Sequence, residues 1–160
     1  MLVQDASNQI HNIKTSNRTM VAFFDYEKAY DKVWRVGLLH KMQKMKLPAR
    51  FIRFTRNFLS GRQTQVEVNG GRSKTFRLDE GLPQGSSISP ILFLIFINDI
   101  DVDLDCETMA KPVRQRYVRM EEGILGSNCK LMQNEINKII DWAKRWKMRV
   151  NTDKTKAMII

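Results

Sequence analysis

The order of apolar and polar residues along this chain predicts a strand near its start and a hairpin further on. Met20–Phe24 is a short apolar run that ends at Asp25, which is the pattern of a buried strand. Apolar and polar residues alternate over residues 64–68, as they do in a half-buried strand. The turn sequence Asn69-Gly70-Gly71 follows, so we expect the chain to return in a second strand over residues 76–78.

Two helices are predicted between these strands. Residues 29–45 carry apolar side chains near the spacing of a helix, and Asp31 lies close to the expected helix start. An acidic side chain in the first turn of a helix interacts favourably with the helix dipole, so we interpret Asp31 as a structural residue. A second helix is expected to begin at Pro48 and to end at Gly61. Its predicted apolar face consists of Phe51, Phe54 or Thr55, and Phe58.

Two further helices and a final strand complete the pattern. Ser89-Pro90 is a helix start, and residues 91–97 are apolar on every side, which predicts a buried helix that crosses the core. A helix is also expected over residues 128–146, with one apolar face that consists of Met132, Ile136, Ile139, Ala143 and Trp146. Residues 157–160 predict a last strand. Together the elements predict one mixed α+β domain.

Positive charge is in clear excess. The 160 residues include 27 Lys and Arg against 17 Asp and Glu, which gives a formal net charge of +10 at pH 7. This imbalance favours a polyanionic partner, and nucleic acid is the commonest one; a basic surface without a function is the alternative. The apolar share of 42% suits a globular protein with a core.

No segment is expected to enter a membrane or to bind zinc. The longest apolar run, residues 91–97, has seven residues, whereas a membrane-spanning helix needs about 20. The N-terminus lacks the basic and apolar regions of a signal peptide, and Cys106 and Cys129 have no metal-binding spacing. We therefore expect an intracellular protein with reduced thiols and no membrane partner. The oligomeric state stays open.

Asp25 is the residue that most strongly indicates chemistry. A carboxylate at the end of a buried strand loses its hydration unless another group compensates for it, and Mg²⁺ is a usual compensator. A turn residue without a ligand is the alternative. The sequence around Asp25 favours the metal ligand.

Three strings of residues follow one another along the chain. The first is Phe24-Asp25-Tyr26-Glu27-Lys28-Ala29-Tyr30-Asp31-Lys32-Val33-Trp34. The second is Glu80-Gly81-Leu82-Pro83-Gln84-Gly85-Ser86-Ser87-Ile88-Ser89-Pro90. The third combines Trp142-Ala143-Lys144-Arg145-Trp146 with Asn151-Thr152-Asp153-Lys154-Thr155-Lys156. These strings resemble the palm motifs of reverse transcriptases from non-LTR retrotransposons, in particular jockey-like elements.

The resemblance extends from about Thr19 to Ile160, with one break. It implies an α+β fold, the palm of a right-hand polymerase, in which helices pack on one face of an antiparallel sheet. It also implies RNA-templated DNA synthesis by two-metal nucleotidyl transfer, with Mg²⁺ as cofactor and an RNA template, a DNA primer and deoxynucleotides as partners. Residues 1–160 would then be a partial reverse transcriptase domain, the palm, without the N-terminal part of the fingers or the thumb, and with residues 106–126 divergent.

The resemblance assigns roles to individual residues. Asp25 would hold Mg²⁺ and take part in catalysis. Lys154 would protonate the pyrophosphate leaving group, a role that suits an amine held near phosphates. Tyr30 would lie under the incoming sugar and exclude a 2′-hydroxyl. The nucleotide-binding positions would be Tyr26, Tyr30, Gln84 and Gly85.

The break in the resemblance falls where the family has a Tyr-Ala-Asp-Asp hairpin. Two-metal phosphoryl transfer needs these carboxylates, because two divalent ions about 4 Å apart require several anionic ligands. No Asp-Asp pair occurs in the chain, and residues 111–120 read Lys-Pro-Val-Arg-Gln-Arg-Tyr-Val-Arg-Met. If Tyr117 replaces the motif tyrosine, Arg119 and Met120 occupy the aspartate positions, where a cation would repel metal. If the chain is a translated remnant without a function, we expect its sheet to lack the central hairpin and to be unstable.

The sequence therefore predicts a reverse transcriptase fragment that does not catalyse the ancestral reaction. One alternative is a residual nucleic-acid-binding module, indicated by two basic clusters, which are Arg50, Arg53 and Arg56, and Lys144, Arg145, Lys147 and Arg149. The other alternative is a translated remnant without a function.

Overall fold

The chain divides into two compact units, each of which has its own core. The computed structural model describes residues 20–101, 104, 107–110, 115–120 and 125–159. One part, which we call the sheet unit, consists of residues 1–26, 100–143 and 150–160. The other part, which we call the helical unit, consists of residues 27–99 and 144–149.

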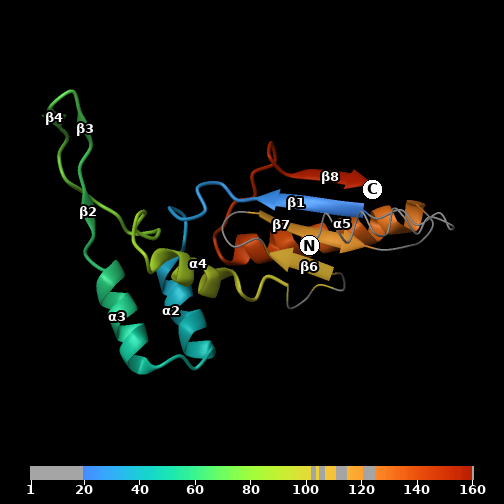
Figure 1. Cartoon of the computed structure of the whole chain (residues 1–160), viewed down its shortest axis with the longest axis horizontal. Helices are drawn as coiled ribbons and strands as arrows, with labels where there is room; N and C mark the ends of the chain where they lie inside the picture. The colour runs from blue at the N-terminus through green and yellow to red at the C-terminus, as the bar shows by residue number, and fades with distance from the viewer. Residues whose placement is uncertain (1–19, 102–103, 105–106, 111–114, 121–124, 160) are drawn as a thin grey trace. The chain divides into compact units, whose positions relative to one another are not determined.

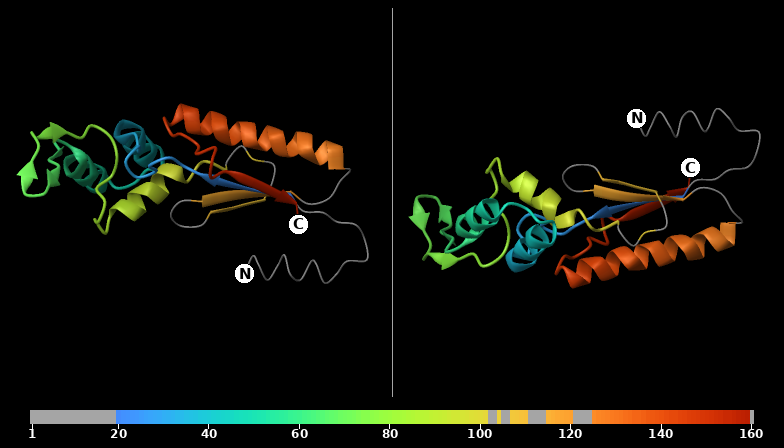
Figure 2. Two further views of the ribbon diagram at one scale, coloured as in Figure 1. Left: turned by 90° about the horizontal axis from the view of Figure 1, so that it is seen from above. Right: turned by 90° about the horizontal axis from the view of Figure 1, so that it is seen from below.

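The sheet unit contains a four-stranded antiparallel sheet with the strand order β6-β7-β1-β8. The strands are β1 (Met20–Asp25), β6 (Glu107–Ala110), β7 (Gln115–Met120) and β8 (Lys156–Ile159). Helix α5 (Leu125–Arg145) belongs to this unit up to Ala143 and runs along one face of the sheet, as Figures 1 and 2 show. The predicted palm-like fold, an antiparallel sheet with a helix on one face, is confirmed.

The apolar pattern explains the core of the sheet unit. β1 is a central strand, and its residues Val21, Ala22 and Phe24 are buried. From α5 the buried apolar side chains are Met132, Ile139, Trp142 and Ala143. The prediction of an apolar face on this helix is thus confirmed at three of its five positions, whereas Ile136 is only partly buried and Trp146 lies beyond the helix end.

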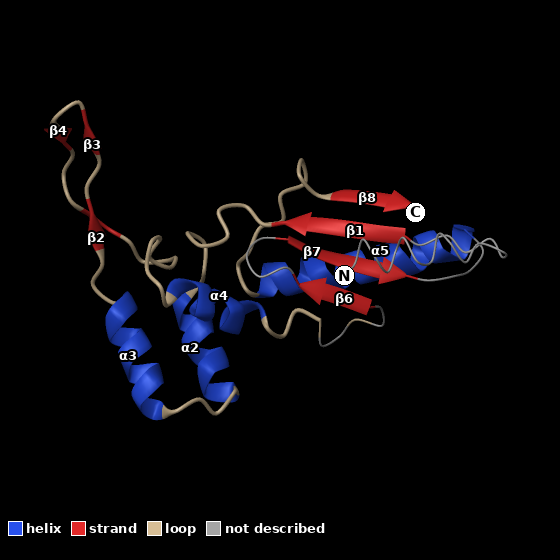
Figure 3. Ribbon diagram, in the orientation of Figure 1, coloured by secondary structure: helices blue, strands red, loops and turns tan. Residues whose placement is uncertain are grey.

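The helical unit contains three helices, α2 (Arg35–Lys44), α3 (Ala49–Leu59) and α4 (Ser89–Ile97). Helix α2 contacts both α3 and α4 (Figure 3). Two short antiparallel ribbons follow α3. The inner ribbon pairs β2 (Gln63–Thr64) with β5 (Phe76–Arg77), and the outer ribbon pairs β3 (Glu67–Val68) with β4 (Gly71–Arg72). None of the described helices is long and apolar enough to cross a membrane.

The predicted hairpin turn is confirmed, but its strands are exposed. Asn69 and Gly70 have φ angles of +48° and +80°, as the turns of tight hairpins require. Val66 and Val68, however, are 51% and 63% exposed, so the prediction of a half-buried strand is wrong. The alternation predicted the extended backbone correctly, but among the described residues no core packs against either face of these strands.

Helix α2 begins later than the sequence predicted. Residues 27–32 form turns, because Lys28 adopts a φ of +44° and its carbonyl oxygen accepts hydrogen bonds from the backbone N–H groups of Asp31 and Lys32. The helix then starts at Arg35 and has no acidic residue in its first turn. The explanation of Asp31 by the helix dipole is therefore wrong.

The burial of α3 agrees with one of its two predicted alternatives, whereas the burial of α4 differs from the prediction. In α3 the alternative with Thr55 is confirmed, because Thr55 is buried and Phe54 is 51% exposed; Leu59, which the prediction did not include, is buried as well. In α4 four of the apolar residues are buried, whereas Ile91 and Leu94 are exposed. The prediction that α4 is buried on every side is wrong, since an all-apolar sequence does not show which side a neighbouring element covers.

A hairpin is present where the sequence lacks the Tyr-Ala-Asp-Asp motif. β6 and β7 form an antiparallel pair, and β7 pairs with β1 along its whole length. Ladder hydrogen bonds come from the backbone, so strands can form without an apolar alternation when a neighbouring strand offers its edge. The expectation that the sheet lacks this hairpin is therefore wrong; its connecting residues 111–114 lie outside the described part.

Candidate active site

Asp25 ends β1 in the sheet unit, and its carboxylate lies near one described cation. Lys154 Nζ is 3.9 Å from Asp25 Oδ2. The side chain of Asp25 is 14% exposed, and that of Lys154 is 72% exposed. The structure thus brings together the two residues to which the resemblance gave catalytic roles. At 3.9 Å their contact is an electrostatic interaction rather than a hydrogen bond.

The turn before β8 determines where Lys154 lies. The backbone N–H of Asn151 donates to the Asp25 carbonyl oxygen at 2.8 Å. The Asn151 carbonyl oxygen accepts from the backbone N–H and the hydroxyl of Thr155, at 2.9 and 2.7 Å. Asn151 Oδ1 accepts from the Lys154 N–H at 3.3 Å. Sequence reasoning assigned Asn151 no role, although asparagine at the start of a polar turn is a known signal.

The strand next to Asp25 does not carry the residues predicted at the aspartate positions. Gln115 is the β7 residue opposite Asp25. Arg119 and Met120 lie opposite the first two residues of β1, at the far end of the strand. Arg119 is four residues and Met120 five residues of extended chain from the position opposite Asp25, about 13 and 17 Å, so their assignment to the aspartate positions is wrong. Residues 111–114, outside the described part, include two basic residues and no acidic one.

Tyr26 follows Asp25 but its side chain belongs to the core of the sheet unit. Its side chain is buried, and its ring centroid lies 6.4 Å from that of Trp142 on α5. Its backbone pairs with Val150 in an isolated bridge. This environment suits a residue that fixes the end of β1 and leaves its ring little access to a ligand.

Tyr30 lies in the helical unit, and its ring stacks on Phe93 of α4. The two ring centroids are 4.9 Å apart, with an interplanar angle of 17°. Tyr30 is partly exposed and Phe93 is buried. The Tyr30 carbonyl oxygen accepts a hydrogen bond of 2.8 Å from the Leu82 N–H, which joins the first motif string to the second.

Asp31 and Gln84 also connect these two strings. Gln84 Nε2 donates to Asp31 Oδ1 at 2.8 Å. A Cβ atom at Gly81, where φ is +81°, would lie 2.6 Å from the Asp31 carbonyl oxygen. Gly81 is therefore required by this close backbone approach. Gly85 has a φ of +82°, but a Cβ atom there would meet nothing within 4 Å.

Arg35 holds the loop before the second string through backbone carbonyl groups. Its guanidinium donates to the carbonyl oxygens of Leu59, Leu78, Glu80 and Gly81, at distances of 2.8, 2.5, 2.8 and 2.8 Å. Burial lowers the pKa of this guanidinium, and the charge of Arg62 adds to the effect. Sequence reasoning assigned Arg35 no role, because its partners lie 24 to 46 residues away.

Comparison with known families agrees with this arrangement. The family model described as reverse transcriptase (RNA-dependent DNA polymerase) matches residues 2–159. The chain belongs to the reverse transcriptase family. Its predicted kinship with non-LTR retrotransposon enzymes is confirmed by relatives from mobile elements of flies. In Drosophila melanogaster these include the RNA-directed DNA polymerase from mobile element jockey, 28% identical over 140 residues, and the probable RNA-directed DNA polymerase from transposon BS, 31% identical over 144.

The matched part of these reverse transcriptases is small. Each alignment covers 83% of this chain, and the chain spans about 15% of the length of either relative. Among solved structures, apo telomerase from Candida tropicalis truncated from its C-terminal domain matches with a TM-score of 0.72. Telomerase from the same organism in complex with a TWJ fragment of telomeric RNA matches with a TM-score of 0.68. Both structures are 14% identical to this chain, and each match covers 99% of it. The matches cover 34% of the first telomerase chain and 28% of the second.

The described residues around Asp25 do not fit the two-ion centre of a reverse transcriptase. Two-ion nucleotidyl transfer requires several carboxylates around the metal ions. Here one carboxylate lies opposite Gln115 and beside the ammonium of Lys154. In the described part of the chain no group of three or more His, Cys, Asp or Glu residues could hold a metal ion.

Proposed function

We propose that this chain is the palm portion of a reverse transcriptase that has lost the ancestral reaction, RNA-templated DNA synthesis. In that reaction the 3′-hydroxyl of a DNA primer attacks the α-phosphate of a deoxynucleotide. The observation that carries the proposal is the environment of Asp25, with Lys154 Nζ at 3.9 Å and no second carboxylate in the sequence from Thr108 to Met120.

Electrostatics supports the loss of metal binding. Asp25 contributes one negative charge, and the nearby ammonium of Lys154 offsets it. A Mg²⁺ ion prefers oxygen ligands and gains little from a site without net negative charge. Lys154 thus serves as the counter-ion of Asp25, whereas the resemblance implied a proton donor to pyrophosphate.

The nucleotide-binding part of the proposal rests on the helical unit. Gln84 is hydrogen-bonded to Asp31, Gly85 borders open space, and the ring of Tyr30 is fixed on Phe93. These contacts support a preformed surface for a deoxynucleotide at Tyr30, Gln84 and Gly85. Tyr26 is left out of this surface because its side chain is buried.

Primer extension on an RNA template, with Mg²⁺ or Mn²⁺, tests the loss of catalysis. We expect no extended product above that of the Asp25→Asn variant, which serves as the matched control. Circular dichroism of both proteins establishes that each is folded. Clear product that disappears in the Asp25→Asn variant would overturn the proposal.

A second candidate function is nucleic-acid binding without catalysis. It is favoured by the charge of residues 32–66, which include nine Lys and Arg and no Asp or Glu. Retained binding of an RNA template or a DNA primer would appear as a gel shift that weakens steeply with salt, because phosphate contacts release counterions. A chain that binds nothing and shows no cooperative melt would be a remnant without a function.

A further inference from the structure

The exposed face of α3 carries three arginines at regular spacing. Arg50, Arg53 and Arg56 follow one another at three-residue intervals, and all three are exposed. The rise of a helix places the first and the last about 9 Å apart along its axis. Phe54 lies between them in the sequence and is 51% exposed. We call these four residues the α3 face.

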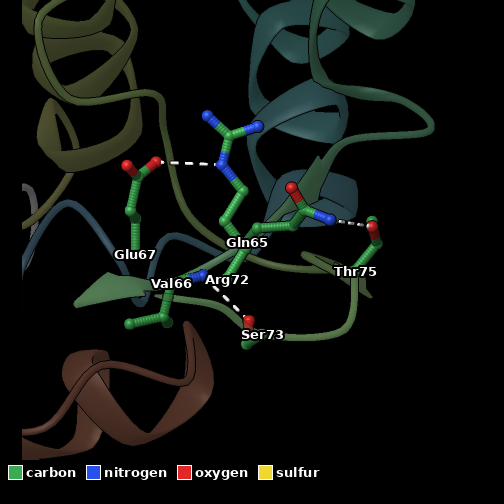
Figure 4. Close-up of polar contacts among 6 residues, drawn as sticks. All are labelled: Gln65, Val66, Glu67, Arg72, Ser73 and Thr75. Atoms are coloured by element: carbon green, nitrogen blue, oxygen red, sulfur yellow. Dashed lines mark hydrogen bonds and ion pairs between the residues drawn. The ribbon is translucent and has the colours of Figure 1, made fainter. Parts of the chain in front are cut away.

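The charge of the α3 face is not neutralised within the described part of the chain. None of its arginines forms a salt bridge with a described residue, and the nearest acidic residues in sequence are Asp31 and Glu67. The outer ribbon differs, because Arg72 Nε lies 3.1 Å from Glu67 Oε2 (Figure 4). The arginines of the α3 face therefore have no acidic partner among the described residues, whereas Arg72 of the outer ribbon has one.

The other side of α3 holds the helix in place. Thr55 and Leu59 are buried, and Arg35 Nη1 donates to the Leu59 carbonyl oxygen at 2.8 Å. The Phe54 ring stacks on Phe58 with a centroid separation of 5.9 Å and an interplanar angle of 10°. The α3 face is thus presented on a fixed support, with the orientation of its aromatic ring already set.

We propose that the α3 face binds single-stranded nucleic acid, with the arginines on successive phosphates and Phe54 stacked on a base. Basic grooves with exposed aromatic rings are the usual means of holding a single strand. A duplex would offer the phosphates but would keep its bases away from Phe54. This inference rests on the second candidate function and assigns it a surface that includes none of the three motif strings.

An anionic membrane is the rival partner for a basic helix. An interfacial helix must insert its apolar side between lipids. The buried side of α3, at Thr55 and Leu59, is already packed within the helical unit. The side that faces solvent offers a single large apolar residue, Phe54. Nucleic acid therefore fits this face better than a lipid surface.

Fluorescence anisotropy with the full chain tests the proposal. The probe is a labelled RNA single strand of about 12 nucleotides, and the competitors are the same sequence as single-stranded DNA and as a duplex. The variant Arg50→Gln, Arg53→Gln and Arg56→Gln should weaken binding at least about tenfold. The slope of the logarithm of its binding constant against the logarithm of the salt concentration should become shallower by about 2. Each phosphate contact on a single strand contributes about 0.7 to this slope, and three contacts are lost. Phe54→Ala should weaken binding about tenfold and leave this slope unchanged.

A matched control removes three charges from the other basic cluster. Lys144→Gln, Arg145→Gln and Arg149→Gln lower the net charge equally, and we expect them to weaken binding less than about threefold. Equal weakening by both triple variants would show a mere net-charge effect and overturn the α3 face. A preference for the duplex over both single strands would also overturn the proposal. So would tighter binding to phosphatidylserine vesicles than to RNA.

The outcomes separate this inference from the function on which it rests. RNA binding that survives all changes in the α3 face leaves nucleic-acid binding in place and removes only the surface. Absence of RNA binding by the unchanged chain removes both. Circular dichroism melts of each variant, compared with the unchanged chain, establish that a lost signal reflects lost contacts.

Discussion

The family resemblance assigns the loop at residues 78–84 and the carboxylate of Asp25 to one reaction. The two differ in how many contacts from the described residues hold them in place. In the helical unit the loop at residues 78–84 is fixed by Arg35, by Asp31 and by backbone hydrogen bonds. In the sheet unit Asp25 faces one exposed lysine at 3.9 Å. The first arrangement satisfies its polar groups internally, whereas the second has a carboxylate whose ligands would have to come from elsewhere. The described residues thus hold the loop of the helical unit in place, whereas they do not complete a metal site at Asp25.

The largest effect that would test this contrast is expected at Gly81. Gly81→Ala places a Cβ atom 2.6 Å from the Asp31 carbonyl oxygen at a φ of +81°. We expect a loss of at least about 3 kcal/mol in the free energy of unfolding, from the left-handed conformation and from the backbone clash. Urea denaturation followed by circular dichroism measures it.

Gly85→Ala is the matched control for this change. Its φ of +82° is nearly the same, but no atom lies within 4 Å of the added Cβ. The expected loss is about 1 kcal/mol, from backbone conformation alone. Equal losses at the two glycines would show that Asp31 and the loop are not in close contact, and the contrast between the two regions would fail.

The next largest effect is expected at Arg35. Arg35→Leu removes a charged donor from four carbonyl oxygens, and hydrogen bonds to charged groups contribute about 1.5–3 kcal/mol. We expect a loss of about 2–3 kcal/mol in the free energy of unfolding, because the exposed part of the loop can rehydrate. Faster hydrogen exchange at the amides of Gly81 and Leu82 should accompany it.

Arg72→Leu is the control for the loss of an arginine. In the described part of the chain its guanidinium pairs with Glu67, and both side chains are well exposed. Such pairs contribute little, so the expected change is below about 0.5 kcal/mol. A change at Arg35 no larger than that at Arg72 would mean that the loop does not depend on the guanidinium.

The sequence predicted the elements better than it predicted their burial. β1 and its end at Asp25 followed from an apolar run closed by a carboxylate, and the turn at Asn69-Gly70 followed from residues that tolerate a positive φ. The start of α2 could not be predicted, because lysine rarely adopts a positive φ and Lys28 has a φ of +44°. The exposed side of α4 was missed because an apolar residue does not specify which neighbour covers it.

The candidate site was predictable where neighbours in sequence make it. Motif strings identified Asp25, Gln84 and Lys154, and local turn chemistry could have identified Asn151. The role of Arg35 could not be predicted, because its carbonyl partners carry no side-chain signal and lie far along the chain. The β6–β7 hairpin was missed for a related reason, since backbone pairing does not depend on the alternation of side chains.

The smallest effect, and the one that bears most directly on Asp25, is its coupling to Lys154. A double-mutant cycle with Asp25→Asn and Lys154→Gln, measured by urea denaturation, should give a coupling energy below about 0.5 kcal/mol. The physical reason is that Lys154 is 72% exposed and its Nζ lies at the long end of ion-pair distances. A coupling energy of about 2 kcal/mol or more would show that Asp25 and Lys154 form a rigid ion pair. Asp25 would then be held by internal contacts, as the loop at residues 78–84 is. A small value means that the ammonium of Lys154 contributes little to holding the Asp25 carboxylate at the end of β1.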